Sequence, residues 1–242
     1  MTDNAPNAVL LAGATGAVGL GTARRLAEQG VRLALAVRRP WQVERVRNSF
    51  EDLDLPPEQL LIGTIGDRDP EAVAGFVKGA EDALGELDGF VSTLGAFHFG
   101  DLGKESATCA DDLFEANVLA NHRLVRAVLP RFRRRRRGQF VFCGAAAVQD
   151  ESPQSGMALY LASKAALDRY ASTLGAEVSE AGIGVTLLCL SVIDTEANRE
   201  SIPDADTSSW TPISAVAESI GASLRSNLGS DAGASNFARK VV

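Results

Sequence analysis

Short apolar runs alternate with longer helical stretches along almost the whole 242-residue chain. The apolar runs are continuous rather than alternating, which is typical of strands covered on both faces of a sheet. They span residues 8–12, 32–37, 59–64, 89–94, 139–143 and 184–190. Helical patterns between them span residues 17–29, 41–53, 70–85, 110–136, 157–181 and 212–226. This order predicts an α/β fold, in which residues 1–242 form a single Rossmann-type domain with a doubly wound parallel sheet and helices on both faces.

The composition argues against several other classes of protein. Lys and Arg number 24 against 31 Asp and Glu, and a formal net charge of −7 does not suit a general binder of nucleic acid or anionic membranes. The basic run Arg131–Arg137 ends a predicted helix, where cations favour the helix dipole, and we expect it to lie in solvent. Three Cys without a CxxC pair and only two His predict no disulfide framework and no metal site. Without a basic leader or a long apolar run, we expect a soluble, cytoplasmic protein.

A glycine loop follows the first predicted strand and opens the first predicted helix. It reads GATGAVG and contains Gly13, Thr15, Gly16, Val18 and Gly19. Glycines at such a turn let the backbone approach a pyrophosphate, and the helix N-terminus supplies free N–H groups. The alternative is a tight turn whose glycines only serve helix packing. The position between strand and helix favours nucleotide binding.

The end of the second predicted strand indicates which dinucleotide binds. NAD-binding folds usually place a carboxylate here for the ribose hydroxyls, but this chain has Arg38 and Arg39. Two guanidinium groups suit a 2′-phosphate, so we expect NADP(H) to be preferred, with NAD(H) as a possible substitute. The alternative is a pair of surface arginines at a strand end.

Tyr160 and Lys164 lie four residues apart at the start of a long helical pattern. At this spacing both side chains point from the same helix face. We expect the ammonium group to lower the pKa of the phenol, which would make Tyr160 an acid or base near neutral pH. An exposed helix-face pair is the alternative, but the chain has only two Tyr, so a chance pair is rare.

Together these motifs resemble the short-chain dehydrogenase/reductases over nearly the whole chain. The resemblance implies that Tyr160 and Lys164 are the catalytic pair, and that Asn117 holds a water of the proton relay. It also implies that Asp67 lies beside adenine, Leu94 and Gly95 lie beside the cofactor, and Thr195 lies near the nicotinamide. The predicted helices 110–136 and 157–181 match those through which the family assembles, so we expect a homodimer or homotetramer.

The family's catalytic serine is absent from this chain. Spacing from the tyrosine places it at Ala147, alignment of the strand places it at Ala145, and the stretch Cys143–Asp150 contains no hydroxyl. Such a serine donates a hydrogen bond to the substrate oxygen, and loss of such a donor typically costs a factor of about 10²–10³. Ser152 or Ser155 could substitute, although their spacing differs from the family's.

The dihydropteridine reductase branch lacks the same serine and keeps the Tyr/Lys pair. Residues Asp194–Pro212 (DTEANRESIPDADTSSWTP) are similar to that branch. Arg38 and the glycine loop differ from it, because those enzymes resemble NADH users with an acidic residue after the second strand.

The predicted activity is an NAD(P)(H)-dependent hydride transfer to a small carbonyl, quinonoid or imine substrate. Tyr160 would donate the proton, Lys164 would lower its pKa and hold the nicotinamide ribose, and Asn117 would order a water. We expect the small-molecule substrate between residues 94–99, 145–154 and 193–210. The alternative is a weakly active or non-catalytic NADP(H)-sensing protein on the same fold.

Overall fold

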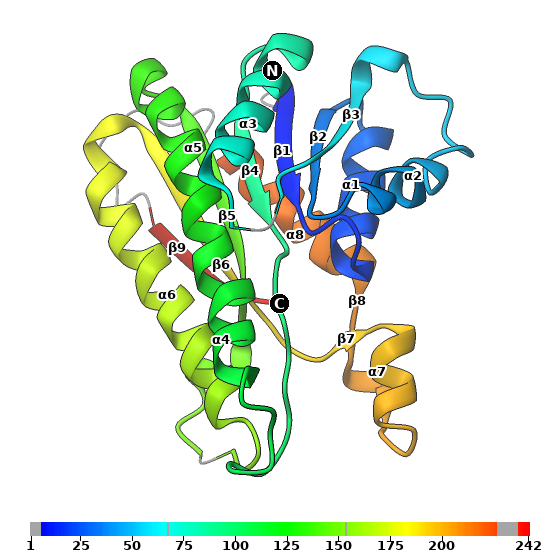
Figure 1. The fold of residues 1–242 in the computed structure, drawn as a ribbon, viewed down its shortest axis with the longest axis vertical. Helices are drawn as coiled ribbons and strands as arrows, with labels where there is room; N and C mark the ends of the chain where they lie inside the picture. Colours follow the sequence, from blue (N-terminus) through cyan, green and yellow to red (C-terminus); the bar gives the residue numbers. More distant parts are fainter. Residues whose placement is uncertain (1–5, 67, 153, 227–236) are drawn as a thin grey trace.

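The computed structural model describes residues 6–66, 68–152, 154–226 and 237–242, which build a seven-stranded parallel sheet. The strand order is β3-β2-β1-β4-β5-β6-β9 (Figure 1). The strands are β1 (Ala8–Ala12), β2 (Arg32–Val37), β3 (Leu60–Thr64), β4 (Gly89–Ser92), β5 (Gly138–Ala145), β6 (Ile183–Leu190) and β9 (Phe237–Val241). The predicted doubly wound fold is confirmed. The order reverses between β1 and β4, and such a reversal opens a ligand crevice beyond the carboxyl ends of the strands.

Helices cover both faces of this sheet (Figure 1). They are α1 (Ala17–Glu28), α2 (Trp41–Asn48), α3 (Pro70–Leu84), α4 (Cys109–Phe114), α5 (Ala120–Arg135), α6 (Ala158–Val178), α7 (Glu196–Ser201) and α8 (Ile213–Ser226). One apolar core joins α3, α5 and α6 to one face, and a second core joins α1, α2 and α8 to the other. Leu10 points into the first core and Leu11 into the second, so the strand is apolar at every position.

The structure differs from the predicted elements at several places. The predicted helix 110–136 is divided by a π-helical turn at Glu115–Leu119, and the predicted strand 89–94 already ends at Ser92. The seventh strand, β9, was not predicted. A short parallel pair, β7 (Ile193–Asp194) with β8 (Thr211–Pro212), brackets α7. Among the described residues, we find no helix with the length and apolar character needed to cross a membrane.

The basic run at the end of α5 is only partly in solvent, so our expectation for it was wrong in part. Arg131 contacts Glu81 at 2.7 Å, and the guanidinium of the partly buried Arg135 donates to the carbonyl of Leu87. Arg136 adopts the left-handed conformation that ends the helix. The run therefore fastens the helix end to its neighbours, because several of its guanidinium groups have partners within the chain.

Candidate active site

The glycine loop forms the turn between β1 and α1. Gly13 has a φ of +102°, which glycine adopts without strain, and its carbonyl accepts a hydrogen bond from Gly16 N at 3.0 Å. A Cβ on Gly19 would lie 2.6 Å from the carbonyl carbon of Gly13 and 2.5 Å from Thr93 Oγ1. No side chain caps the first turn of α1. The helix N-terminus therefore keeps N–H groups available for an anion.

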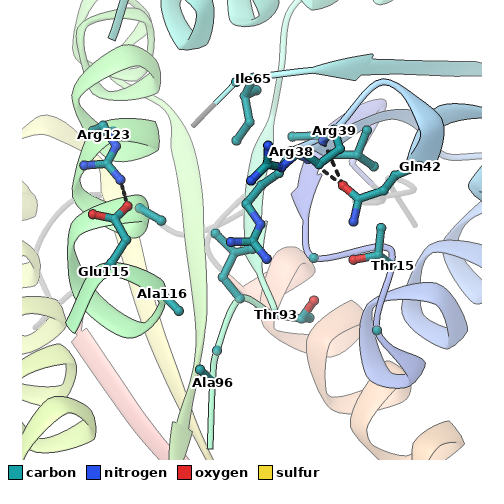
Figure 2. Close-up of a pocket in the computed structure, with 18 of the residues that line it drawn as sticks. Thr15, Arg38, Arg39, Gln42, Ile65, Thr93, Ala96, Glu115, Ala116 and Arg123 are labelled. Carbon is teal, nitrogen blue, oxygen red and sulfur yellow. Dashed lines mark hydrogen bonds and ion pairs between the residues drawn. The ribbon is translucent and has the colours of Figure 1, made fainter. Parts of the chain in front are cut away.

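A cavity of about 660 Å³ opens beside this loop (Figure 2). Seven of the expected cofactor residues line it: Gly13, Thr15, Gly16, Arg38, Arg39, Leu94 and Gly95. Val18 and Gly19 do not line the cavity, since Val18 packs against the core and Gly19 against Gly13. Asp67 lies outside the described residues.

Gln42 orients the strand end that carries the two arginines, and sequence reasoning missed it. Its side-chain Oε1 accepts hydrogen bonds from the backbone N–H groups of Arg38 at 3.1 Å and of Arg39 at 2.9 Å (Figure 2). A glutamine shortly after a helix begins commonly reaches back to such groups, so this contact had a signal in the sequence.

The opposite side of the cavity holds a charged cluster that had no sequence signal. Arg123 pairs with Glu115 (Figure 2), and Arg68 lies 3.4 Å from the same carboxylate. Burial lowers the pKa of Arg123, and the neighbouring charge of Arg68 lowers it further. These residues come from three different elements, so only the fold brings them together.

Lys164 is buried beside Gly95, which lines the cavity, although Lys164, Asn117 and Tyr160 do not themselves line it. Its Nζ donates a hydrogen bond to the carbonyl of Cys143 at 3.1 Å, and a Cβ on Gly95 would lie 3.1 Å from this nitrogen. Burial lowers the pKa of Lys164, while the nearby Cys143 acts in the opposite direction. Burial raises the pKa of the Cys143 thiol to about 11. Cys143 is therefore a buried thiol rather than a nucleophile.

Asn117 lies on the π-helical turn and is fully buried. Its Oδ1 accepts from Ala96 N at 2.9 Å, and its Nδ2 donates to Ala96 O at 3.1 Å and to Ser163 Oγ at 2.8 Å. Its main-chain carbonyl accepts from Asn121 Nδ2 at 3.0 Å. The side chain therefore ties the segment after β4 to α6.

Tyr160 is half-buried, and its ring meets the edge of Phe97 at 4.8 Å between ring centroids. Burial raises the pKa of its phenol. Our expectation that Lys164 lowers this pKa is wrong for this structure, because the ammonium group is engaged with the carbonyl of Cys143. Tyr160 and Lys164 nevertheless share the first turns of α6.

The segment that would carry a serine begins where β5 ends at Ala145, and it continues as a short 3-10 helix, Ala146–Gln149. Gln149 Nε2 donates to Asp168 at 2.9 Å, which fastens this segment to α6. Ser152 and Ser155 are exposed in the following loop. Thr195 caps α7, where its Oγ1 accepts from Asn198 N at 3.2 Å, and it does not line the cavity.

With this site in place, the comparisons identify the class of protein. The chain belongs to the short-chain dehydrogenase family, whose profile, described as short chain dehydrogenase, matches residues 7–206. A protein of Streptomyces virginiae described as a ketoacyl reductase of the monensin polyketide synthase is 30% identical over 200 residues, 81% of this chain and 74% of that protein.

Other relatives and solved structures agree with this family. Gluconate 5-dehydrogenase of Gluconobacter oxydans is 26% identical over 83% of this chain and 77% of its own length. A Xanthobacter autotrophicus protein named inactive 2-(S)-hydroxypropyl-CoM dehydrogenase 2 is 33% identical over 57% of this chain and 60% of its own. The fold is similar to that of an actinorhodin polyketide ketoreductase variant with NADPH, with a TM-score of 0.82, 21% identity, and coverage of 100% and 97% of the two chains.

Proposed function

We propose that this chain is an NADP(H)-preferring reductase that delivers hydride to a small carbonyl, quinonoid or imine substrate without a catalytic serine. One observation carries the proposal: Asn117 and Lys164 lie beside Gly95, which lines the cavity. A Cβ on Gly95 would lie 3.1 Å from both Asn117 Oδ1 and Lys164 Nζ, so a larger residue would crowd these two groups. Tyr160 lies one helical turn from Lys164 on the same helix.

The cavity fits the cofactor. The glycine turn is a cradle that a Cβ would fill, and Arg38 and Arg39 provide donors for a 2′-phosphate. The expected residues that line the cavity and would hold the cofactor are Gly13, Thr15, Gly16, Arg38, Arg39, Leu94 and Gly95, with Lys164 next to Gly95. When bound, NADPH supplies the hydride. NADH would lack the phosphate that the arginines recognise, so we expect it to bind more weakly.

Tyr160 would give a proton to the substrate oxygen or nitrogen as the hydride arrives. A phenol with its ordinary pKa of about 10 keeps its proton at neutral pH, and burial raises the pKa of Tyr160 further, so the phenol can act as the donor. Lys164 would hold the nicotinamide ribose. Asn117 would act mainly through position, because its amide already bonds Ala96 and Ser163.

The missing serine limits the range of substrates. With no hydroxyl in the sequence Cys143–Asp150, nothing in that stretch polarises a simple ketone. An activated substrate such as a quinonoid or conjugated imine has less need of that hydrogen bond. The similarity of Asp194–Pro212 to dihydropteridine reductases supports such substrates. Family resemblance also supports a cytoplasmic homodimer or homotetramer.

The alternative, a weakly active or non-catalytic NADP(H) sensor, has one specific observation in its favour. A relative that is 33% identical over part of the chain carries the word inactive in its name. The presence of Tyr160, Lys164 and Asn117 weighs against the sensor, because a protein that only binds the cofactor does not need them.

The two tyrosines provide a matched test of the proposal. Tyr160→Phe should keep NADPH affinity within about 2-fold and reduce turnover at least about 100-fold, since general acid catalysis typically contributes 10²–10⁴-fold. Tyr170→Phe removes the other phenol, which contacts His122 at 3.2 Å, and should leave turnover unchanged. Oxidation of NADPH at 340 nm with quinones, pterins and small ketones gives the turnover. Equal turnover in both variants would reject the role of Tyr160.

A further inference from the structure

Aromatic side chains are exposed beside Tyr160. Phe97 and Phe99 lie in the segment after β4 and are 65% and 67% exposed, although Phe97 packs against the tyrosine ring. This segment also contacts the loop before α6, since Gly100 N donates to Gly156 O at 2.9 Å. An apolar surface therefore borders the phenol that would donate the proton.

The segments that leave the carboxyl ends of β4, β5 and β6 are strongly acidic. Because the strands are parallel, these ends share one edge of the sheet, and Figure 1 shows the three segments extending from the same end of the molecule. Residues 93–108, 145–159 and 191–212 together contain nine carboxylates and two cations. The carboxylates are Asp101, Glu105, Asp150, Glu151, Asp194, Glu196, Glu200, Asp204 and Asp206. These segments therefore hold the whole net charge of −7.

Both cations in these segments have acidic partners close by. Lys104 Nζ lies 2.9 Å from Asp101, and Arg199 makes two hydrogen bonds to Asp194, at 2.6 and 2.8 Å. Lys164, which is buried, donates to the carbonyl of Cys143. A substrate with a carboxylate or phosphate would find these three cations already engaged.

The lining of the cofactor cavity has the opposite balance of charge, because four arginines line it (Arg38, Arg39, Arg68 and Arg123) against two carboxylates (Asp112 and Glu115). The anionic cofactor and the substrate would therefore enter regions of different charge. Exposed charges interact over roughly one Debye length, about 8 Å at physiological ionic strength, so each region mainly affects the charged groups that bind within it. Apolar contact area then supplies the affinity for the substrate.

We infer that the substrate is an apolar, uncharged organic carbonyl or imine compound, free in solution and without carboxylate or phosphate groups. Coenzyme A thioesters and keto acids would be disfavoured. This inference rests on the proposed function, because it assigns a substrate class to the same site.

Three aromatic ketones of nearly equal size test the charge preference: methyl 4-acetylbenzoate, 4-acetylbenzoate and 4-acetylphenyltrimethylammonium. At low ionic strength, kcat/KM for the ester should exceed that for the carboxylate by at least about 10-fold, and 0.5 M NaCl should shrink the ratio. The cationic ketone should be no worse than the carboxylate. A carboxylate that is turned over as well as the ester would overturn the inference.

Charge-neutralising variants tie the preference to this end of the molecule. The triple variant Glu196→Gln/Glu200→Gln/Asp204→Asn should reduce the ester-to-carboxylate ratio at least about 3-fold. The matched control Glu51→Gln/Asp54→Asn/Glu58→Gln makes the same change of charge in the segment that leads into the amino end of β3, and it should leave the ratio unchanged. Equal effects of the two variants would contradict the local origin of the preference.

The inference can be tested even if the proposed reaction fails. Where NADPH binds but none of the ketones is reduced, calorimetry with the three corresponding alcohols on the NADP⁺-loaded protein replaces turnover. If the carboxylate alcohol binds more weakly than the ester alcohol, the inference is supported, while the lack of turnover counts against the reductase activity on this panel. Equal binding, or no binding of any alcohol, overturns the apolar substrate site.

Discussion

Gly19→Ala tests whether the glycine loop is built for close backbone approach. A Cβ here would lie 2.6 Å from the carbonyl carbon of Gly13 and 2.5 Å from Thr93 Oγ1, against ordinary contacts of 3.4–4 Å. The turn and α1 must therefore move apart by roughly an ångström, and overpacking of this kind costs about 1–3 kcal/mol. Alanine regains about 1 kcal/mol of helix propensity, so the net loss should be about 0–2 kcal/mol.

Cofactor binding should suffer more than stability, because the displaced turn carries the N–H groups that would face the pyrophosphate. We expect the Kd for NADPH to rise at least about 10-fold, which corresponds to about 1.4 kcal/mol. Urea unfolding measures the free energy of unfolding, and calorimetric titration measures the Kd.

Gly79→Ala is the matched control for this variant. Gly79 is exposed within α3, and a Cβ there would meet no atom within 4 Å. This change should raise the free energy of unfolding by up to about 1 kcal/mol and leave the Kd for NADPH unchanged. Wild-type affinity in Gly19→Ala would refute the proposed cradle.

Three further predictions address the cofactor, the ion pairs and the buried thiol. Arg38→Ala should weaken NADPH binding about 10–100-fold and leave NADH binding unchanged, and equal losses in titrations of the two would exclude phosphate recognition. Asp168→Asn removes the buried carboxylate that pairs with Arg239, and it should lower the free energy of unfolding, measured in urea, by about 1–3 kcal/mol. The exposed control Asp82→Asn should change it by less than about 0.5 kcal/mol, and similar losses in both would contradict this account. The thiol has a pKa of 9.0 in the unfolded chain and about 11 at Cys143, so the stability that the protonated thiol contributes is complete below pH 9 and falls by about 2–3 kcal/mol as the pH rises through 11. In urea unfolding at a series of pH values, the free energy of unfolding of Cys143→Ala should fall less than that of the wild type over this range, and an equal fall would exclude this cause.

The sequence predicted six of the seven strands and missed β9, which lies at one edge of the sheet. The strand β9 contains Arg239 and Lys240, which interrupt any apolar pattern. In the fold, Arg239 pairs with Asp168 on α6, and Lys240 Nζ lies 3.3 Å from Ser223 Oγ on α8. These partners are 71 and 17 residues away along the chain, so periodicity alone could not indicate that the segment is a strand.

The candidate site was predictable in its residue types more than in its geometry. The glycine loop, Arg38, Arg39 and the Tyr160–Lys164 spacing are local patterns, and the structure places the loop and both arginines around one cavity. The π-helical turn at Glu115–Leu119 is not visible in the sequence, because its 5 residues are too few to show a period of their own. The cluster of Arg68, Glu115 and Arg123 needs three elements and has no local signal.

The surroundings of Tyr160 on α6 bear on which of its protonation states the proposed reaction would use. Burial raises the pKa of Tyr160, and Lys164 gives its hydrogen bond to the carbonyl of Cys143 rather than to the phenol. A phenol that holds its proton at neutral pH can donate it to a reduced substrate, whereas oxidation of an alcohol would require the phenolate. An acid whose pKa is raised stays protonated over a wider pH range, so the donor form persists well above neutrality. Reduction with NADPH therefore uses the form of Tyr160 that is already present at neutral pH, whereas the reverse reaction would first have to remove its proton.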